Sequence, residues 1–212
     1  MHGIVNYEVF LMAAILLSIT PGTDTMYIIS RSISQGRKAG IYSTLGITCG
    51  TIVHTLLAAF GLSVILMSSA LVFNAIKIIG ACYLGYLGVK MIVAKASSTE
   101  NKASLPKQTN KKIFFQGLVT NVTNPKVALF FLAFIPQFID TANGGSGPIP
   151  FLILGLTSCL TGAIWCLTIA IGASFTTKKF RENKTAESIL NKLTGIVFIG
   201  MGVKLLSTKS NV

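Results

Sequence analysis

Long apolar stretches separated by short polar segments dominate this chain of 212 residues. A transmembrane helix needs about 20 predominantly apolar residues, and six stretches reach that length. Inside each stretch the hydrophobic residues follow no clear period, as is typical of helices that are apolar on all sides. The six predicted spans are Tyr7–Ile29, Ile41–Leu66, Ala70–Ala94, Ile113–Phe138, Pro148–Phe175 and Ile189–Ser207.

Composition and charge agree with a membrane protein. The chain is 51% hydrophobic and 11% charged, whereas a soluble domain carries roughly 25% charged residues. The net charge is +12, and most of the 18 Lys and Arg residues, Arg31 among them, follow spans 1, 3 and 5. Positive loops stay in the cytoplasm, so loops 31–40, 95–112 and 176–188 are predicted to be cytoplasmic and both termini external. Nucleic-acid binding is disfavoured, because no basic cluster is interleaved with stacking aromatics.

The four cysteines fall inside predicted spans at positions 49, 82, 159 and 166. None forms a Cys-x-x-Cys pair, and His2 and His54 are far apart, so the spacing of a zinc site is missing. We interpret the cysteines as small apolar residues. No metal and no cofactor is expected.

Three pairs of segments recur in the same order along the two halves of the chain. Lys77–Gly85 resembles Lys192–Gly200, Leu45–Thr48 resembles Leu154–Thr157, and spans 1 and 4 each carry a proline, Pro21 and Pro125. Three spans per half is an odd number, so the second half must cross the membrane in the opposite sense. The predicted fold is therefore an all-α integral membrane protein with six transmembrane helices in a 3+3 inverted repeat, a plan of many secondary transporters. Its parts are a repeat at 1–94, a cytoplasmic linker at 95–112 and a repeat at 113–212.

The two prolines are predicted to break helices 1 and 4. Proline removes a backbone hydrogen bond and clashes with the preceding turn. A helix from residue 4 to 35 would measure about 48 Å, longer than the ~30 Å hydrocarbon core, so Pro21 lies near mid-depth. Freed backbone groups at that depth must face protein or a wet cavity. The start of a half-helix after each break suits a carboxylate.

Two ionisable residues, Asp24 and Lys126, flank these breaks. Such residues inside a membrane are costly and point to function. Two other interpretations stay open at this point: a proline kink that serves packing alone, and a structural ion pair between Asp24 and Lys126. His54 is either a proton relay or a packed polar residue.

The motifs resemble the lysine-exporter (LysE/RhtB) family of bacterial amino-acid efflux permeases. They are Thr20-Pro21-Gly22-Thr23-Asp24, Gly36-Arg37-Lys38-Ala39-Gly40, Leu45–Gly50 with His54, and Phe115–Lys126, which ends in Asn121-Val122-Thr123-Asn124-Pro125-Lys126. Thr23 stands where the family has a second proline. The resemblance covers essentially the whole chain.

The resemblance implies export of amino acids across the bacterial cytoplasmic (inner) membrane, driven by the proton motive force through alternating access. Asp24 and His54 are candidates for coupling to the proton, and a homodimer is left open. With Asp24 the one acid at membrane depth, neutral substrates such as threonine, homoserine or a branched-chain amino acid are favoured. The candidate substrate site comprises Thr20, Pro21, Gly22, Thr23, Asp24, Asn121, Asn124, Pro125 and Lys126.

Three alternatives were weighed. An exporter of heavy-metal cations on the same kind of fold should carry Cys, His or several carboxylates at mid-membrane depth. A redox protein of the wider fold should carry cysteines beside the breaks, and spans 1 and 4 have none. A membrane-embedded enzyme should show a Ser/His/Asp group or paired carboxylates. An amino-acid exporter is the preferred interpretation.

Overall fold

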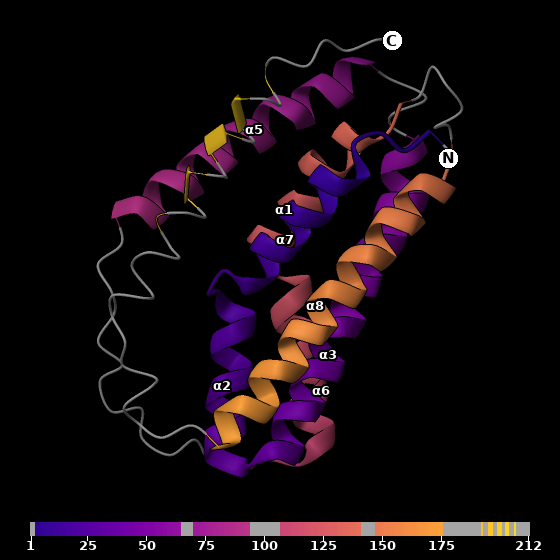
Figure 1. The fold of residues 1–212 in the computed structure, drawn as a ribbon. Helices are drawn as coiled ribbons and strands as arrows, with labels where there is room; N and C mark the ends of the chain where they lie inside the picture. The colour runs from indigo at the N-terminus through magenta and orange to yellow at the C-terminus, as the bar shows by residue number, and fades with distance from the viewer. Residues whose placement is uncertain are drawn as a thin grey trace.

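The computed structural model describes residues 3–64, 70–93, 107–140 and 147–175 together with single positions between 192 and 206. Within these ranges every regular element is a helix, apart from one isolated backbone bridge between Ile4 and Ile139. Figure 1 shows most of the helices running roughly along one direction. The sixth predicted span and the loop at 176–188 fall almost wholly outside the described residues.

Spans 1 and 4 are both broken. Helix α1 (Tyr7–Ile19) is followed by α2 (Thr23–Gln35) at an angle of 47°. Helix α6 (Asn110–Val122) is followed at 46° by a second segment, in which α7 (Pro125–Leu129) continues into a π-helical turn, η2 (Phe130–Phe134), and a 3₁₀ turn, η3 (Ile135–Phe138). The breaks fall at the predicted prolines, because neither Pro21 nor Pro125 can donate to the preceding turn.

Two helices are long and apolar enough to cross a membrane without a break. They are α3 (Arg37–Leu57) with its π-helical extension η1 (Ala58–Leu62), and α8 (Ile149–Phe175). The broken pairs bring the number of candidate spans to four. Large apolar side chains cover the outside of these helices, and Leu57 and Leu160 are each more than 60% exposed. Outward faces of this kind suit lipid rather than water.

The backbones of α3 and α6 are in direct contact. A Cβ placed on Gly46 would overlap the carbonyl oxygen of Phe114. On the facing helix, a Cβ on Gly117 would lie 2.8 Å from the carbonyl oxygen of Ser43. Small residues allow such close approach between membrane helices, so α3 and α6 form one closely packed pair.

The third span is α5 (Ala70–Val93). In Figure 1, α1 and α7 lie between α5 and α8. A Cβ on Gly88 of α5 would lie 2.6 Å from the carbonyl oxygen of Gly195, and a Cβ on Gly195 would lie 2.6 Å from that of Gly88. The described part of the sixth predicted span therefore packs closely against α5.

Two element boundaries differ from the predictions. The helix was predicted to continue to residue 35, and α2 does end at Gln35, but the predicted cytoplasmic loop 31–40 is reduced to Gly36 because α3 begins at Arg37. Gly36 turns the chain alone because its φ of 82° is easily adopted by glycine. The fourth span begins at Asn110, inside the predicted linker, because the side chain of Thr109 caps the helix by accepting from the backbone N–H of Lys112.

Candidate functional site

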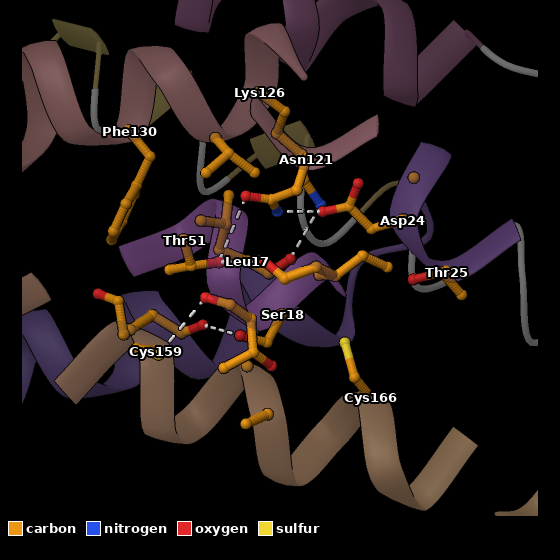
Figure 2. Close-up of a pocket in the computed structure, with 18 of the residues that line it drawn as sticks. Leu17, Ser18, Asp24, Thr25, Thr51, Asn121, Lys126, Phe130, Cys159 and Cys166 are labelled. Atoms are coloured by element: carbon orange, nitrogen blue, oxygen red, sulfur yellow. Dashed lines mark hydrogen bonds between the residues drawn. The ribbon is translucent and has the colours of Figure 1, made fainter. Parts of the chain in front are cut away.

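The two helix breaks meet around a small cavity of about 70 Å³. The broken spans and the two unbroken helices all contribute to its wall (Figure 2). Its polar lining includes Asp24, Asn121 and Lys126, which lie beside the breaks, and Thr51 and Ser158 of the unbroken helices. The apolar lining is made by Ala14, Leu17, Ile47, Val127, Phe130, Phe131 and Ala163. A cavity that holds benzene measures about 150 Å³, so this one has room for no more than a few waters.

Asp24 ties the two broken spans together. It lies in the first turn of α2. One carboxylate oxygen accepts from Asn121 Nδ2 at 2.7 Å, and the other accepts from Asn124 Nδ2 at 3.1 Å. Figure 2 shows the side chains of Asp24 and Asn121 pointing toward each other and joined by a hydrogen bond. The positive end of the α2 dipole adds to the stabilisation of the negative charge.

The side chain of Lys126 makes a second connection between the two breaks, from α7 to the end of α1. Its ammonium donates to the carbonyl oxygens of Leu17 at 3.0 Å and Thr20 at 3.1 Å. These carbonyls belong to the last turn of α1, where the helix dipole is negative and favours a cation. Among the described residues Asp24 and Lys126 make no direct ion pair. Each charge is held instead by polar groups of the opposite break.

The two breaks differ in how their second helix starts. The side chain of Asn124 caps α7, because its oxygen accepts from the backbone N–H of Lys126 at 3.0 Å. The corresponding position before α2 is Gly22, and no side chain caps that helix. The first amides of α2 therefore remain open to an anion, whereas Asn124 already occupies the start of α7.

Except for Gly22, the remaining predicted site residues lie around this centre without entering the cavity wall. Thr20 is buried, and its hydroxyl donates to the carbonyl oxygen of Leu16. Thr23 is exposed, with its hydroxyl 3.5 Å from a carboxylate oxygen of Asp24. Pro21 occupies the break itself, and Pro125 is the first residue of α7. Gly22 does line the cavity, next to the ammonium of Lys126.

His54 is buried behind Asn121. Its Nε2 lies 3.3 Å from the carbonyl oxygen of Asn121, and its ring stacks on Phe131 at 5.6 Å between centroids. Thr51 also supports Asn121, since its hydroxyl donates to Asn121 Oδ1 at 3.4 Å. His54 is thus connected to Asp24 only through Asn121, and it does not line the cavity.

Sequence reasoning missed the contributions of α3 and α8. Cys159 and Cys166, interpreted as apolar packing, are buried and line the cavity, and Figure 2 shows Cys166 pointing into it from α8. Cys82, by contrast, is exposed on α5. A signal was present: Ser158, Gly162 and Cys166 recur every four residues, which places small or polar groups on one face of an apolar helix.

No group of three or more His, Cys, Asp or Glu residues that could hold a metal ion occurs in the part of the chain that the structure describes. The polar groups that line the cavity are a side-chain amide, hydroxyls, one carboxylate and one ammonium, together with the thiols of Cys159 and Cys166. Apart from the two thiols, which are soft-metal ligands, these groups suit a polar organic ion.

Comparison with known proteins agrees with this geometry. The family model of the LysE type translocator matches residues 15–209. The chain is 35% identical to the uncharacterized membrane protein YrhP of Bacillus subtilis, over 96% of this chain and 98% of the relative. It is 29% identical to the leucine efflux proteins of Klebsiella pneumoniae and Salmonella typhimurium, over at least 98% of each chain. No solved structure is significantly similar. The chain belongs to the LysE type translocator family, and it is a multi-pass membrane transporter rather than an enzyme.

Proposed function

We propose that this protein exports a neutral amino acid with an apolar side chain, such as leucine, across the cytoplasmic membrane. The observation that carries the proposal is the meeting of Asp24, Lys126 and the uncapped start of α2 around one cavity. An amino acid at neutral pH carries one carboxylate and one ammonium group, and this site offers a complement to each. Two relatives are named for the efflux of leucine.

Each part of the substrate has a matching part of the wall. The open amides of α2 and the ammonium of Lys126 would bind the substrate carboxylate. Asp24 would accept from the substrate ammonium in place of its bond to Asn121 or Asn124. The apolar lining, in which Val127, Phe130 and Phe131 are prominent, would take an aliphatic side chain.

The size of the cavity supports a transport cycle with more than one state. About 70 Å³ is less than half of a cavity that holds benzene, so the site must widen to admit leucine. Widening requires the half-helices to move apart, and the two breaks supply the points at which they can bend. We infer alternating access, in which the site opens to one side of the membrane at a time.

The 3+3 inverted repeat is part of the proposal. The two broken spans bend by 47° and 46°, and each is followed in its half by an unbroken helix, α3 or α8. The third pair, α5 and the sixth predicted span, contact each other reciprocally through Gly88 and Gly195. These matches support repeats at 1–94 and 113–212, with the linker 95–112 in the cytoplasm and both termini outside.

We also propose that transport is coupled to protons through Asp24. A carboxylate that binds the substrate ammonium in one state can bind a proton in another, so that the empty carrier returns with its charge neutralised. His54 contacts Asn121, which in turn holds Asp24. It would therefore influence Asp24 through Asn121 rather than receive the proton directly.

The test measures leucine flux in proteoliposomes under an imposed pH gradient. We expect Asp24→Asn to lower the flux at least tenfold, since the substrate ammonium and the proton lose their acceptor. The matched control is Glu8→Gln, which removes an exposed acid at the start of α1 and should leave the flux unchanged. Undiminished flux in Asp24→Asn would contradict the role of Asp24. Wild-type liposomes that move leucine no faster than empty ones would contradict the exporter itself.

A further inference from the structure

A second polar cluster lies away from the cavity, where α2 and α6 approach the linker. This Arg31 cluster consists of Tyr27, Arg31, Gln35, Gln108 and Gln116. Arg31 is only 5% exposed, so it is an interior residue, although the sequence placed it among the loop cations. Its guanidinium donates to the side-chain oxygens of Gln35 at 3.2 Å, Gln108 at 2.9 Å and Gln116 at 3.1 Å.

Other members of the Arg31 cluster also form hydrogen bonds that connect α2 with α6 and Gln108. The hydroxyl of Tyr27 donates to the carbonyl oxygen of Ile113 at 2.8 Å and lies 3.3 Å from the side-chain oxygen of Gln116. Gln35 exchanges two bonds with the backbone of Gln108, at 2.8 and 3.0 Å. All of these bonds join α2 to α6 or to Gln108, the residue next to the helix cap.

The Arg31 cluster lies between the cavity and the linker. Asp24 and Arg31 are seven residues apart on α2, which corresponds to about 10 Å along the helix. Ile28, which lies between them in the sequence of α2, packs in an apolar cluster with Ile47, Cys166 and Ala170. A solute that moved between the cavity and the linker side along α2 and α6 would have to pass the Arg31 cluster.

The contact between α2 and α6 differs in kind from the contacts of both helices with α3. Helix α6 is packed backbone to backbone against α3 at Gly46, so it cannot shift without α3. Helix α2 is also close to α3, because a Cβ on Gly40 would overlap Ser32 Oγ, but α2 meets α6 through the long side chains of Arg31 and Gln116. Hydrogen bonds between these side chains can be replaced by hydrogen bonds to water, which costs less than leaving the groups without a partner.

We propose that the Arg31 cluster is the gate that closes the substrate path on the linker side of the membrane. The closed gate is the state described here. In the open gate α2 tilts away from α6 about the break at Pro21 while it keeps its contact with α3 at Gly40, and water takes the place of the glutamine oxygens of Gln108 and Gln116. This inference rests on the alternating access of the proposed function.

The test uses Cys166 as a reporter, since it lines the cavity and is buried. In a background of Cys49→Ser, Cys82→Ser and Cys159→Ser, a small membrane-impermeant methanethiosulfonate is added to membrane vesicles of either orientation. We expect Arg31→Gln to raise the rate at which Cys166 is labelled from the linker side at least fivefold. Labelling from the other side should not change.

Two further variants make the result specific to the gate. Gln116→Glu replaces a bond in which only the guanidinium is charged by an ion pair with a carboxylate, which can also accept two parallel bonds from Arg31, so linker-side labelling should fall below the wild-type rate. Arg37→Gln removes an exposed cation from the same end of the molecule and should leave the rate at the wild-type value.

The proposal is overturned if Arg31→Gln labels at the wild-type rate or accelerates equally from both sides. Should that variant fail to insert, Gln116→Glu decides, and a rate at or above the wild-type value is the contrary result. Labelling needs no substrate, so the outcome is separate from the proposed function. If the protein moves no leucine but Cys166 is labelled as expected, the result supports the gate and contradicts the proposed export of leucine.

Discussion

The two ends of the molecule on either side of the cavity are closed by opposite chemistry. At the linker end, α2 meets α6 through the directional bonds of the Arg31 cluster. At the other end, α1 meets η2 and η3 through an aromatic cluster of Phe10, Phe130, Phe134 and Phe138. Within it the centroids of neighbouring rings lie 4.8 to 6.4 Å apart.

The contrast is sharpest at corresponding positions. Arg31 and Ile135 each lie ten residues after a break proline, and Tyr27 and Phe131 each lie six residues after it. Ile135 is fully buried among apolar side chains, whereas Arg31 lies among glutamines. The ring of Phe131 stacks on His54, whereas the hydroxyl of Tyr27 bonds to the backbone of α6.

The two ends therefore differ in the kind of interaction that opens at a free-energy cost. Opening the aromatic end exposes apolar surface, at roughly 25 cal/mol per Å², and breaks close ring contacts. Opening the linker end exchanges hydrogen bonds with the protein for hydrogen bonds with water, at a net loss of about 1 kcal/mol for a neutral bond and about 1.5–3 kcal/mol for a bond to the charged guanidinium. The cost of opening thus depends on buried apolar area at one end and on the number of hydrogen bonds at the other.

The largest effect is expected from Phe134→Ala in the aromatic cluster. Removing this buried ring should lower the free energy of unfolding by about 3–5 kcal/mol, because the surrounding rings collapse only partly into the space. The measurement is the unfolding of the purified protein in detergent. Phe60→Ala is the control, since Phe60 is 61% exposed on η1. An equal loss of unfolding free energy in both variants would contradict the claim that the aromatic cluster stabilises its end of the molecule.

A smaller effect is expected from Tyr27→Phe in the Arg31 cluster. The change deletes the hydroxyl that donates to the carbonyl oxygen of Ile113 and keeps the ring. The free energy of unfolding should fall by about 0.5–1.5 kcal/mol, the usual net value of one hydrogen bond. Tyr86→Phe, on an exposed ring of α5, should cost less in the same measurement. A loss of unfolding free energy as large as that of Phe134→Ala would contradict the contrast between ring packing at one end and single hydrogen bonds at the other.

The smallest effect on stability is expected from converting the linker end to apolar chemistry. Replacing both Arg31 and Gln116 by leucine should lower the free energy of unfolding less than Arg31→Leu alone, because the oxygen of Gln116 is removed together with its donor, whereas the oxygen of Gln108 loses its donor in both variants. Arg31→Leu alone leaves glutamine oxygens without their donor and should cost about 1–3 kcal/mol. The double variant should also lower linker-side labelling of Cys166 below the wild-type rate, since the contact between α2 and α6 now resembles the aromatic end. Faster labelling would contradict the comparison.

The breaks and their charged residues could be predicted from the sequence. The effect of proline on a helix is local, so Pro21 and Pro125 are enough to place two bends, and both are confirmed. The expectation that Asp24, Asn121 and Lys126 would share one cavity follows from their depth in the membrane, and the structure brings them to one wall. Their roles in transport remain a prediction, as does the six-helix repeat.

Other parts of the site could not be predicted in this way. Arg31 was placed in a loop because cations near a span end are usually solvated. Its burial depends on Gln108 and Gln116, which are 77 and 85 residues away in the chain. The cavity faces of α3 and α8 were hidden because apolar helices look alike on all sides until their neighbours are known.

The apolar spans, the two helix breaks and the charged residues beside them can be predicted from the sequence, because hydropathy, helix length and the geometry of proline act over a few residues. Which charge meets which partner is seen only in the three-dimensional structure. It showed that Asn124 caps α7 while α2 starts uncapped, that Lys126 bonds to α1 rather than to Asp24, and that one end closes with rings and the other with glutamines. These outcomes depend on how each helix is rotated toward neighbours far away in the chain, and that rotation is set by packing.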